Sequence, residues 1–551
     1  MPCSARKFVR VTKFLLAGVT VFCVSWIACV NEWHAEVRWS DRRAMGSGLS
    51  TMRTIVAYSE GKQAEMDRPY PVACDRLPAL PDVPHINRTW YPLAAEESSW
   101  QRVHGTRVSL YAAYYDDRTQ QRYVRILAIL HGRNISSEEP LFCQTRTVSN
   151  KDDDSVEVVA AKPIAIWWHE WDTTSSEVET PILLTCPLTE PLFGPSIVSI
   201  VTEPCDDPTN GFIIQPSKNS YKRTFTVCVK DMLFDNDISQ NLIEWIETNK
   251  ILGVQIIDIY IDSIPQNMVD ILLYYQQLGF VRLFQVPIKH KPNRSLWQRR
   301  RDHIITYNDC LYRNIRESEF ISPLDVDEII IPKIAYTLSG LLKRLVNQGW
   351  DPKKYSAILI QNVFFFDFMQ DIHHYKPKNV NITKNKVYVK RDDVRIPGME
   401  KIGIEEIELI DDTNSLNSNS IQEILQSSRR IDGKLKCKRD VPVPKLARHV
   451  VSSAMVSPVG YYSKSLMHTK KVLTAFNHYP LASLGTSGFA GWSAPYDEVQ
   501  LNHYKESCNT TMVVECAAYG TRARIDRSAL RLQRRVVRAL ARAACAGIYI
   551  T

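Results

Sequence analysis

Three features are missing from this sequence, and each absence narrows the class of protein. None of its 13 cysteines forms a Cys-x-x-Cys pair, so a zinc ribbon is not expected. No Ala-x-Ala-like site follows the apolar run Phe14–Val30, which argues against a cleaved signal peptide. A basic excess spread along the chain is also missing, because the net charge of +8 comes largely from eight arginines and one aspartate between Arg522 and Arg542. No nucleic-acid partner is therefore expected.

The run Phe14–Val30 has seventeen residues and no charge. As a helix it would span roughly 25 Å, which suits a thin membrane of the secretory pathway. Basic residues precede it, and positive flanks stay on the cytoplasmic side. We therefore expect a cytoplasmic tail over 1–13, a single-pass type II signal anchor over 14–30 and a luminal body, with a cleaved signal peptide as the alternative. The basic residues are Arg6, Lys7, Arg10 and Lys13.

Sequons and cysteines agree with a luminal body. Ten cysteines follow the apolar run, and an oxidising lumen would bridge some of them, although the sequence does not give the pairing. Five Asn-x-Ser/Thr sequons are candidate glycosylation sites. They are Asn87, Asn134, Asn293, Asn381 and Asn509.

The body divides by composition and periodicity. A polar, proline-containing stretch over 31–99 is typical of a stem. Short alternating runs over 100–215 predict a small antiparallel β-rich accessory unit that supports the domain after it. A catalytic domain is expected over 216–520. The segment 521–551 is expected to form a basic amphipathic helix, either docked on the body with solvated arginines or in contact with anionic lipids or acidic glycans.

Strand-like and helix-like runs alternate after residue 216, which predicts an α/β fold with a mainly parallel sheet and right-handed crossovers. Ligands of such sheets collect at the carboxyl ends of the strands. This places Asp262 and the pair Asp325 and Asp327 at one edge of the sheet. The expected strands are Phe225–Val229, Gly253–Asp262 and Val281–Val286, and the expected helices are Leu242–Leu252 and Met268–Leu278.

Asp325-Val326-Asp327 lies between two apolar, strand-like runs. In an extended Asp-x-Asp the outer side chains leave one face of the backbone, and two such carboxylates can hold a hard divalent cation. The cation would neutralise the charge on a departing nucleoside diphosphate. A helix cap or a loop salt bridge is the alternative. The other Asp-x-Asp pairs, which begin at Asp152 and Asp235, lie in polar stretches and are expected to be solvated.

Seven segments along the chain carry a family resemblance: Tyr111–Arg118, Phe225–Val229, Leu242–Glu247, Asn308–Arg313, Leu324–Glu328, Asn477–Pro480 and Leu501–Lys505. In this order they resemble glycosyltransferase family 92, a family of Golgi type II membrane enzymes. The resemblance covers about residues 100 to 540. It implies a GT-A type nucleotide-sugar transferase fold, manganese as the divalent metal, UDP-galactose as the donor and a glycan or glycoprotein acceptor, with fucose of N-glycan cores as one acceptor.

The resemblance also implies roles for individual residues. Asp325 and Asp327 would form the metal and diphosphate site, with His503 as the first choice for a third ligand and His478 as the second. Asp262 would contact the ribose or uracil, or it is a plain acid at a strand end. Asp309 and Arg313 would face the diphosphate, or they pair with each other. Glu328 is a candidate general base by proximity alone.

The sequence also departs from the family pattern. Ser322 and Pro323 interrupt a strand that should be central, where proline lacks the donor for the ladder. Lys505 stands where arginine is expected, and His303 stands where glutamine is expected. None of these departures removes a candidate metal ligand. The alternative function is a non-catalytic glycan-binding or adhesion protein that retains the fold. A membrane and a glycan acceptor are the expected partners, with a homodimer as one candidate assembly.

Overall fold

The chain divides into two compact units, Met1–Met66 and Asp67–Thr551, and every residue described below belongs to the second. The predicted anchor, most of the predicted stem and four of the five sequons lie outside the described residues. The fifth sequon, Asn293, is exposed in the loop before helix α5. The computed structural model describes residues 71–548 except for 86–87, 93–99, 134–139, 148–154, 168–177, 193–195, 215–222, 371–381, 384–385, 391–405, 411–440, 461, 486–490, 507–515 and 521.

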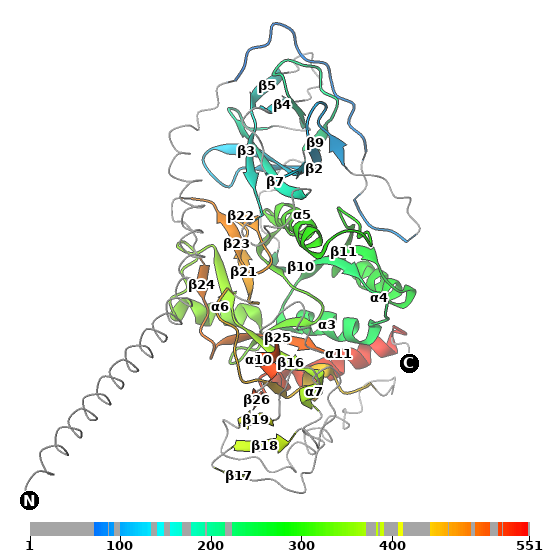
Figure 1. Ribbon diagram of the computed structural model, residues 1–551, viewed down its shortest axis with the longest axis vertical. Helices are drawn as coiled ribbons and strands as arrows, with labels where there is room; N and C mark the ends of the chain where they lie inside the picture. Colours follow the sequence, from blue (N-terminus) through cyan, green and yellow to red (C-terminus); the bar gives the residue numbers. More distant parts are fainter. Residues whose placement is uncertain are drawn as a thin grey trace, which may run out of the picture. The chain divides into compact units, whose positions relative to one another are not determined.

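Two antiparallel sheets form the region where the accessory unit was expected (Figure 1). Their apolar faces share one core, which includes Leu110, Ile126 and Leu184. The disulfide Cys143–Cys186 joins a strand of one sheet to a strand of the other. One sheet has the order β1 (Gln101–Arg102), β2 (Val108–Asp116), β3 (Arg122–His131), β7 (Glu179–Leu188) and β6 (Lys162–Ala165), and the other has the order β5 (Ser155–Ala160), β4 (Phe142–Thr147), β8 (Ser196–Val201) and β9 (Phe212–Ile214).

A seven-stranded sheet follows, and its first four strands in spatial order are parallel, as the alternating pattern predicted. The fifth, β21, is antiparallel to both of its neighbours. Helices α3 (Ser239–Leu252) and α4 (Gln266–Gln277) connect the parallel strands. The order is β12 (Val281–Gln285), β11 (Ile256–Ser263), β10 (Arg223–Leu233), β13 (Ser318–Pro323), β21 (Lys464–His468), β15 (Ala357–Ile360) and β24 (Gly491–Ser493).

Pro323 does not break the central strand, because it lies at the end of β13. The neighbouring strand β21 pairs with Phe320 and Ile321, before the proline. The next residue, Leu324, resumes the ladder by donating its N–H to the carbonyl of Cys228 at 3.1 Å. A proline at a strand end removes a donor that the ladder does not use. After Leu324 the chain leaves the sheet, and Asp325 is the next residue.

Local sequence signals explain where the main helices begin and end. Helix α5 (Leu296–Asn314) starts after Ser295, whose hydroxyl accepts the N–H of Gln298. Helix α3 ends at Gly253, whose φ of 98° is a left-handed conformation that favours glycine. The turn lets the chain enter β11 and returns it to the parallel sheet.

A three-stranded sheet carries the candidate site. Strand β14 (Glu328–Pro332) runs antiparallel to β25 (Val499–Lys505), which runs parallel to β16 (Asn362–Phe366). The register places His503 opposite both Glu328 and Phe364. Glu328, the residue after Asp327, therefore lies opposite His503, although the two are far apart in the sequence.

The arginine-rich segment differs from the single helix predicted over 521–551. Arg522–Ile525 form a strand, β26, between β19 (Glu406–Ile410) and β20 (Val451–Ser453). The helix α11 begins at Gln533 and ends at Cys545. The strand forms because both of its sides find ladder partners, which overrides the helical spacing of the arginines.

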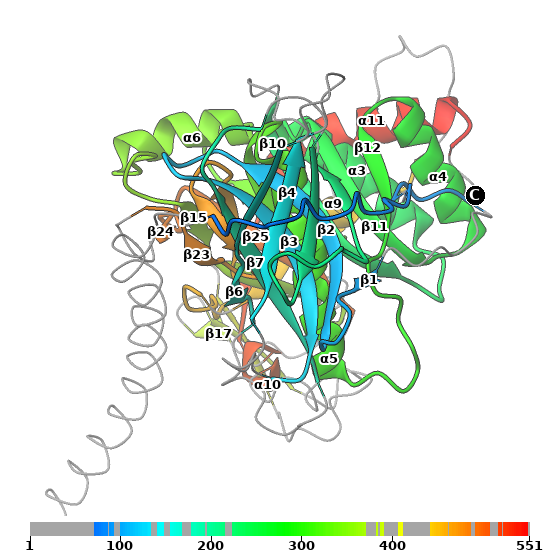
Figure 2. The ribbon, with the colours of Figure 1, turned by 90° about the horizontal axis from the view of Figure 1, so that it is seen from above.

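Helix α11 packs along α3, as both ribbon views show (Figures 1 and 2). Its residues Val536, Leu540 and Ala543 belong to the main core. Arg531 donates to the carbonyls of Ile334 and Ala335, each at 2.8 Å. The apolar contacts support the prediction of a docked surface helix, whereas Arg531, just before α11, binds backbone carbonyls and is not the solvated arginine that was predicted.

Membrane-spanning potential is absent from the described part of the chain. No helix within 71–548, its gaps set aside, is long and apolar enough to cross a membrane. The predicted anchor Phe14–Val30 lies outside that part.

Candidate functional site

The loop Asp325–Asp327 connects β13 to β14 and is held in shape by Glu328. The carboxylate of Glu328 accepts the N–H of Asp325 at 2.9 Å, and the N–H of Glu328 donates to the carbonyl of Asp325 at 3.0 Å. Glu328 is 2% exposed, and burial raises the pKa of its carboxyl group. Glu328 therefore positions the loop, and its burial argues against the role of general base that proximity alone suggested.

Two lysines neutralise Asp325. The Lys230 ammonium lies 3.0 Å from the Asp325 carboxylate, and the Lys464 ammonium lies 3.7 Å from it. Burial alone would raise the pKa of Asp325, but the two ammonium groups outweigh it and hold the pKa well below its usual value. Asp325 is therefore a carboxylate at any pH near neutrality.

Asp327 and His503 lie side by side at the mouth of the site. The His503 Nε2 atom is 3.3 Å from Asp327 Oδ2, and the Asp327 side chain is 41% exposed. The ring of His503 packs against Phe364 with centroids 5.1 Å apart, and its Nδ1 is buried without a hydrogen bond. Burial would raise the pKa of Asp327, but His503 outweighs it and lowers the pKa. The pair offers one oxygen and one nitrogen donor to the same point.

His478 has both ring nitrogens engaged. Its Nδ1 is 2.7 Å from the carbonyl of Ser463, and its Nε2 is 3.2 Å from the amide nitrogen of Asn477. Burial lowers the pKa of His478 to about 3. The Asn477 amide oxygen also accepts from Lys464 at 2.8 Å. This geometry favours His503 over His478 as a candidate ligand.

A pocket of about 480 Å³ opens beside the loop. It lies between the carboxyl end of β10, the start of α3 and the end of β25. Both acidic and basic side chains line it, together with apolar residues that include Trp245 and Ile329. The charged lining includes Lys230, Asp325, Asp327, Arg299, Lys445 and Lys505.

Asp262 lies at the carboxyl end of β11, which is the edge of the sheet that the sequence predicted. Its carboxylate accepts the backbone N–H of His290 at 2.7 Å. Burial raises the pKa of Asp262. It is not among the described residues that line the pocket, so the structure favours the plain strand-end role over a contact with the nucleotide.

Asp309 and Arg313 pair with each other, which is the second of the two alternatives that the sequence left open. The Arg313 Nε donates to Asp309 Oδ2 at 2.6 Å, and the side chain of Asp309 has no exposed surface. The hydroxyls of Tyr114 and Tyr260 also donate to Asp309. We call Asp309, Arg313, Tyr114 and Tyr260 the buried aspartate cluster. Both carboxylate oxygens of Asp309 are hydrogen-bonded within the fold, so they are not available to a nucleotide-sugar donor.

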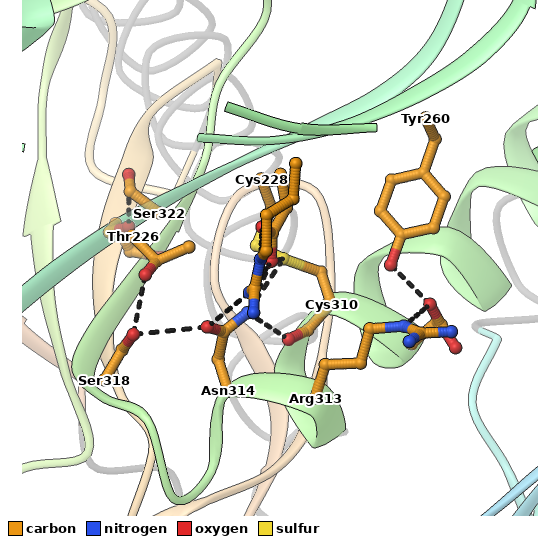
Figure 3. Close-up of a disulfide and its surroundings, with 12 residues drawn as sticks. Thr226, Cys228, Tyr260, Cys310, Arg313, Asn314, Ser318 and Ser322 are labelled. Carbon is orange, nitrogen blue, oxygen red and sulfur yellow. Dashed lines mark hydrogen bonds and ion pairs between the residues drawn. A yellow bond between two sulfur atoms is a disulfide. The ribbon is translucent and has the colours of Figure 1, made fainter. Parts of the chain in front are cut away.

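A disulfide fixes this part of α5 to the sheet. Figure 3 shows the Cys228–Cys310 bridge, which joins β10 to α5, beside Asn314, Tyr260 and Arg313. Asn314 donates to the carbonyl of Cys310 at 2.8 Å. The bridge ties the strand that carries Lys230 to the helix that carries Asp309 and Arg313 of the buried aspartate cluster.

Sequence reasoning missed several charged residues of the site. Lys230 and Asp231 follow directly on the apolar run of β10, and charged residues at the carboxyl end of a parallel strand are a signal that could have found them. Asp231 pairs with Arg299 at 2.9 Å and with His303 at 2.8 Å. Lys464 gives no such signal, because it begins an antiparallel strand far along the chain.

The donor atoms fit a divalent cation in part. Asp327 and His503 offer the oxygen and nitrogen donors that manganese accepts. Asp325 would supply a further oxygen, but its carboxylate is paired with Lys230. Within the described ranges, no three His, Cys, Asp or Glu side chains are grouped as a metal site. A third donor therefore requires Asp325 to exchange its lysine partner for the cation.

The fold has a mixed α/β architecture with several sheets and is compatible with a glycosyltransferase fold. The sequence profile of glycosyltransferase family 92 matches residues 223–531, which is more than half of the chain. The chain belongs to glycosyltransferase family 92, and membership indicates glycosyl transfer.

Two curated relatives from Caenorhabditis elegans are similar to parts of this chain. Beta-1,4-galactosyltransferase galt-1 is 22% identical over 252 residues, which are 42% of this chain and 54% of the relative. Glycosyltransferase family 92 protein F13G3.3 is 27% identical over 137 residues, which are 24% of this chain and 27% of the relative. The chain therefore matches about half or less of the length of these relatives.

Proposed function

We propose that the protein transfers galactose from UDP-galactose to a glycan in a reaction that depends on a divalent metal, with manganese as the cation. One observation carries the proposal: the Asp325–Asp327 loop lies at the carboxyl ends of the parallel strands, beside a pocket of about 480 Å³. Such a position is where α/β sheets bind nucleotides. A GT-A type fold is the architecture we propose for this sheet. Galactose is proposed because the name of one relative specifies a galactosyltransferase.

The residues of the site would have separate roles. Asp325, Asp327 and His503 would hold the cation, which when bound neutralises charge on the departing diphosphate. Glu328 orients the loop through its two contacts with Asp325. Basic side chains at the pocket, among them Arg299 and Lys505, would balance the remaining charge of the donor.

The alternative is a non-catalytic glycan-binding protein that retains the fold. The observation in its favour is that Asp325 is neutralised by two lysines, which leaves two donors in place for a cation. A protein of that kind would bind glycans without consuming a nucleotide sugar. Consumption of a nucleotide sugar separates the two functions.

The donor and acceptor can be tested together with full-length protein and a panel of nucleotide sugars. We expect UDP-galactose to be consumed in preference to UDP-glucose, UDP-N-acetylglucosamine and GDP-fucose. Glycopeptides with core fucose should gain one hexose by mass spectrometry, and matched glycopeptides without fucose should gain less. Glycan binding without consumption of any donor would support the non-catalytic alternative and contradict the proposal.

We propose a Golgi membrane location, single-pass and type II, from the charge asymmetry around Phe14–Val30. Endoglycosidase treatment should increase gel mobility, because the sequons would then lie in the lumen. Carbonate extraction should leave the protein in the membrane pellet. Unchanged mobility, or release into the soluble fraction, would contradict this topology.

A further inference from the structure

Lys230 is the cation that Asp325 contacts on the side of the pocket. It lies on β10 near its carboxyl end, and its ammonium is 3.0 Å from each oxygen of the Asp325 carboxylate. The side chains of Lys230 and Asp325 are 24% and 28% exposed, and both line the pocket. The ammonium is therefore placed where a ligand in the pocket would meet it.

Lys464 offers a contrast on the other side of Asp325. Its side chain is 1% exposed and lies 3.2 Å from Glu328 and 3.7 Å from Asp325. Its ammonium also donates to Asn477 at 2.8 Å. Three partners hold the enclosed Lys464 in place. Asp325 is thus neutralised by one enclosed lysine and by one lysine that faces the pocket.

A divalent cation and Lys230 would compete for the same oxygens. Both oxygens of Asp325 face the Lys230 ammonium, so a cation that took them would place two like charges a few ångströms apart. Repulsion between such charges is strong near a partly enclosed site. Lysine has a flexible four-carbon stem and three donors that can turn to a new acceptor. An anion bound beside the cation would supply that acceptor.

We propose that Lys230 exchanges partners: it pairs with Asp325 in the absence of donor, and it pairs with the diphosphate of a nucleotide donor once a divalent cation takes the oxygens of Asp325. The inference rests on the proposed function and assigns to Lys230 a role that positions the donor. The exchange keeps the carboxylate neutralised in both states. Cation binding frees the Lys230 ammonium for an anion, and anion binding neutralises the repulsion between that ammonium and the cation. The two binding events are therefore coupled.

The exchange predicts opposite changes in two affinities of the Lys230→Met variant, measured by titration calorimetry on full-length protein. Affinity for Mn²⁺ alone should rise by about fivefold, because the competing ammonium is gone. Affinity for UDP in saturating Mn²⁺ should fall by about tenfold, because a charge-assisted contact with the diphosphate is lost. Lys230→Arg should retain most of the UDP affinity. A purely structural lysine would lower both affinities when it is removed.

Lys250→Met is the matched control. Lys250 is a half-exposed lysine on α3 that pairs with Glu247 at 3.9 Å and does not line the pocket. This control should leave both affinities within twofold of wild type. Thermal unfolding of each variant establishes that the titrated protein is folded, and Lys230→Gln replaces Lys230→Met if methionine prevents folding. Affinities for Mn²⁺ and UDP that change in the same direction, or do not change, would overturn the exchange.

Inorganic pyrophosphate separates this inference from the proposed function. If wild type binds Mn²⁺ but no nucleotide, the galactosyltransferase proposal fails. Pyrophosphate binding that still weakens in Lys230→Met while Mn²⁺ binding tightens would support the exchange. Pyrophosphate binding that is absent, or unaffected by the substitution, would overturn the exchange even if UDP-galactose is consumed.

Discussion

Two aspartate sites on neighbouring parts of this molecule are built in opposite ways. In the buried aspartate cluster, Asp309 has no exposed surface and takes donors from Arg313 and two tyrosines. At the edge of the sheet, the Asp327 side chain is 41% exposed and contacts one histidine. Asp325 beside it is neutralised by lysines. The first arrangement uses every oxygen inside the fold, whereas the second leaves carboxylates open to a pocket.

The contrast separates structural carboxylates from carboxylates that can bind a ligand. Arginine and tyrosine give directional hydrogen bonds that close a buried carboxylate, and such sets are costly to break. Lysine gives a point charge on a flexible stem and can give way to another cation. The identity of the neutralising residue therefore indicates the role of the acid more clearly than the acid itself does.

The largest expected effect is on transfer at the sheet edge. Asp327→Asn should lower the rate of glycosyl transfer by roughly a hundredfold or more, because the cation it would hold is worth several kcal/mol to the transition state. The fold should remain intact by circular dichroism and thermal unfolding, since the side chain is 41% exposed and asparagine has nearly the same shape. Asp325→Asn should show the same loss of rate. Near-normal transfer by either folded variant would contradict the role of this loop.

The next effect is on stability at the buried aspartate cluster. Asp309→Asn should lower the free energy of unfolding by about 3 kcal/mol, because it leaves the mostly buried charge of Arg313 unpaired. Urea unfolding measures this loss, and transfer per folded molecule should stay near the wild-type rate. Unchanged stability together with lost UDP binding would show that Asp309 serves the donor instead.

The two regions should also differ in their response to mild acid. The pKa of His478 is about 3 in the folded chain and about 6.5 when unfolded, so below pH 6.5 the unfolded state binds a proton that the folded state does not. The free energy of unfolding should therefore decrease as the pH is lowered. His478→Gln should remove about 2 kcal/mol of the decrease between pH 7 and pH 5. Urea unfolding at the two pH values measures it.

Asp309 provides the control for this dependence of the free energy of unfolding on pH. Burial would raise the pKa of Asp309, but Arg313 outweighs it and lowers the pKa. Its contribution is therefore fully present above the usual aspartate range and is lost only in stronger acid. Asp309→Asn should leave the slope between pH 7 and pH 5 unchanged. Equal slopes for wild type and His478→Gln would contradict the prediction.

The smallest effect is expected at an aspartate in neither group. Asp237 is exposed and accepts the N–H of Ser239 at the start of α3, a contact that an asparagine oxygen can replace. Asp237→Asn should change the free energy of unfolding by less than about 0.5 kcal/mol and leave transfer unchanged. A marked loss of transfer would mean that the Asp-x-Asp pair beginning at Asp235 takes part in donor binding.

The parallel core of the sheet was predictable because its strands and helices are local in sequence. The runs at Phe225–Val229 and Leu242–Leu252 have the periods of a strand and a helix, and both elements are present. The bounds were less predictable, since β10 extends to Leu233 beyond its apolar run. The strand β26 could not be predicted from its arginines, because its partners are distant strands.

The candidate site was predictable only where its residues are close in sequence. Asp325 and Asp327 carry a local pattern, and their position between two strands is as expected. Lys464 reaches Asp325 through an antiparallel strand more than a hundred residues later, and no local pattern announces it. Asp309 and Arg313 have the spacing of a helical pair, but the tyrosines that close the cluster come from β2 and β11.

The central claim is that the Asp325–Asp327 loop supports metal-dependent use of a nucleotide sugar. The most direct measurement is the rate at which full-length protein releases UDP from UDP-galactose with a fucosylated glycopeptide, in Mn²⁺ and in EDTA, beside Asp327→Asn. We predict rapid release by wild type in Mn²⁺ and a fall of about a hundredfold in EDTA, to the level of Asp327→Asn in Mn²⁺. Release that is equal in EDTA and Mn²⁺, or retained in Asp327→Asn, would contradict the claim.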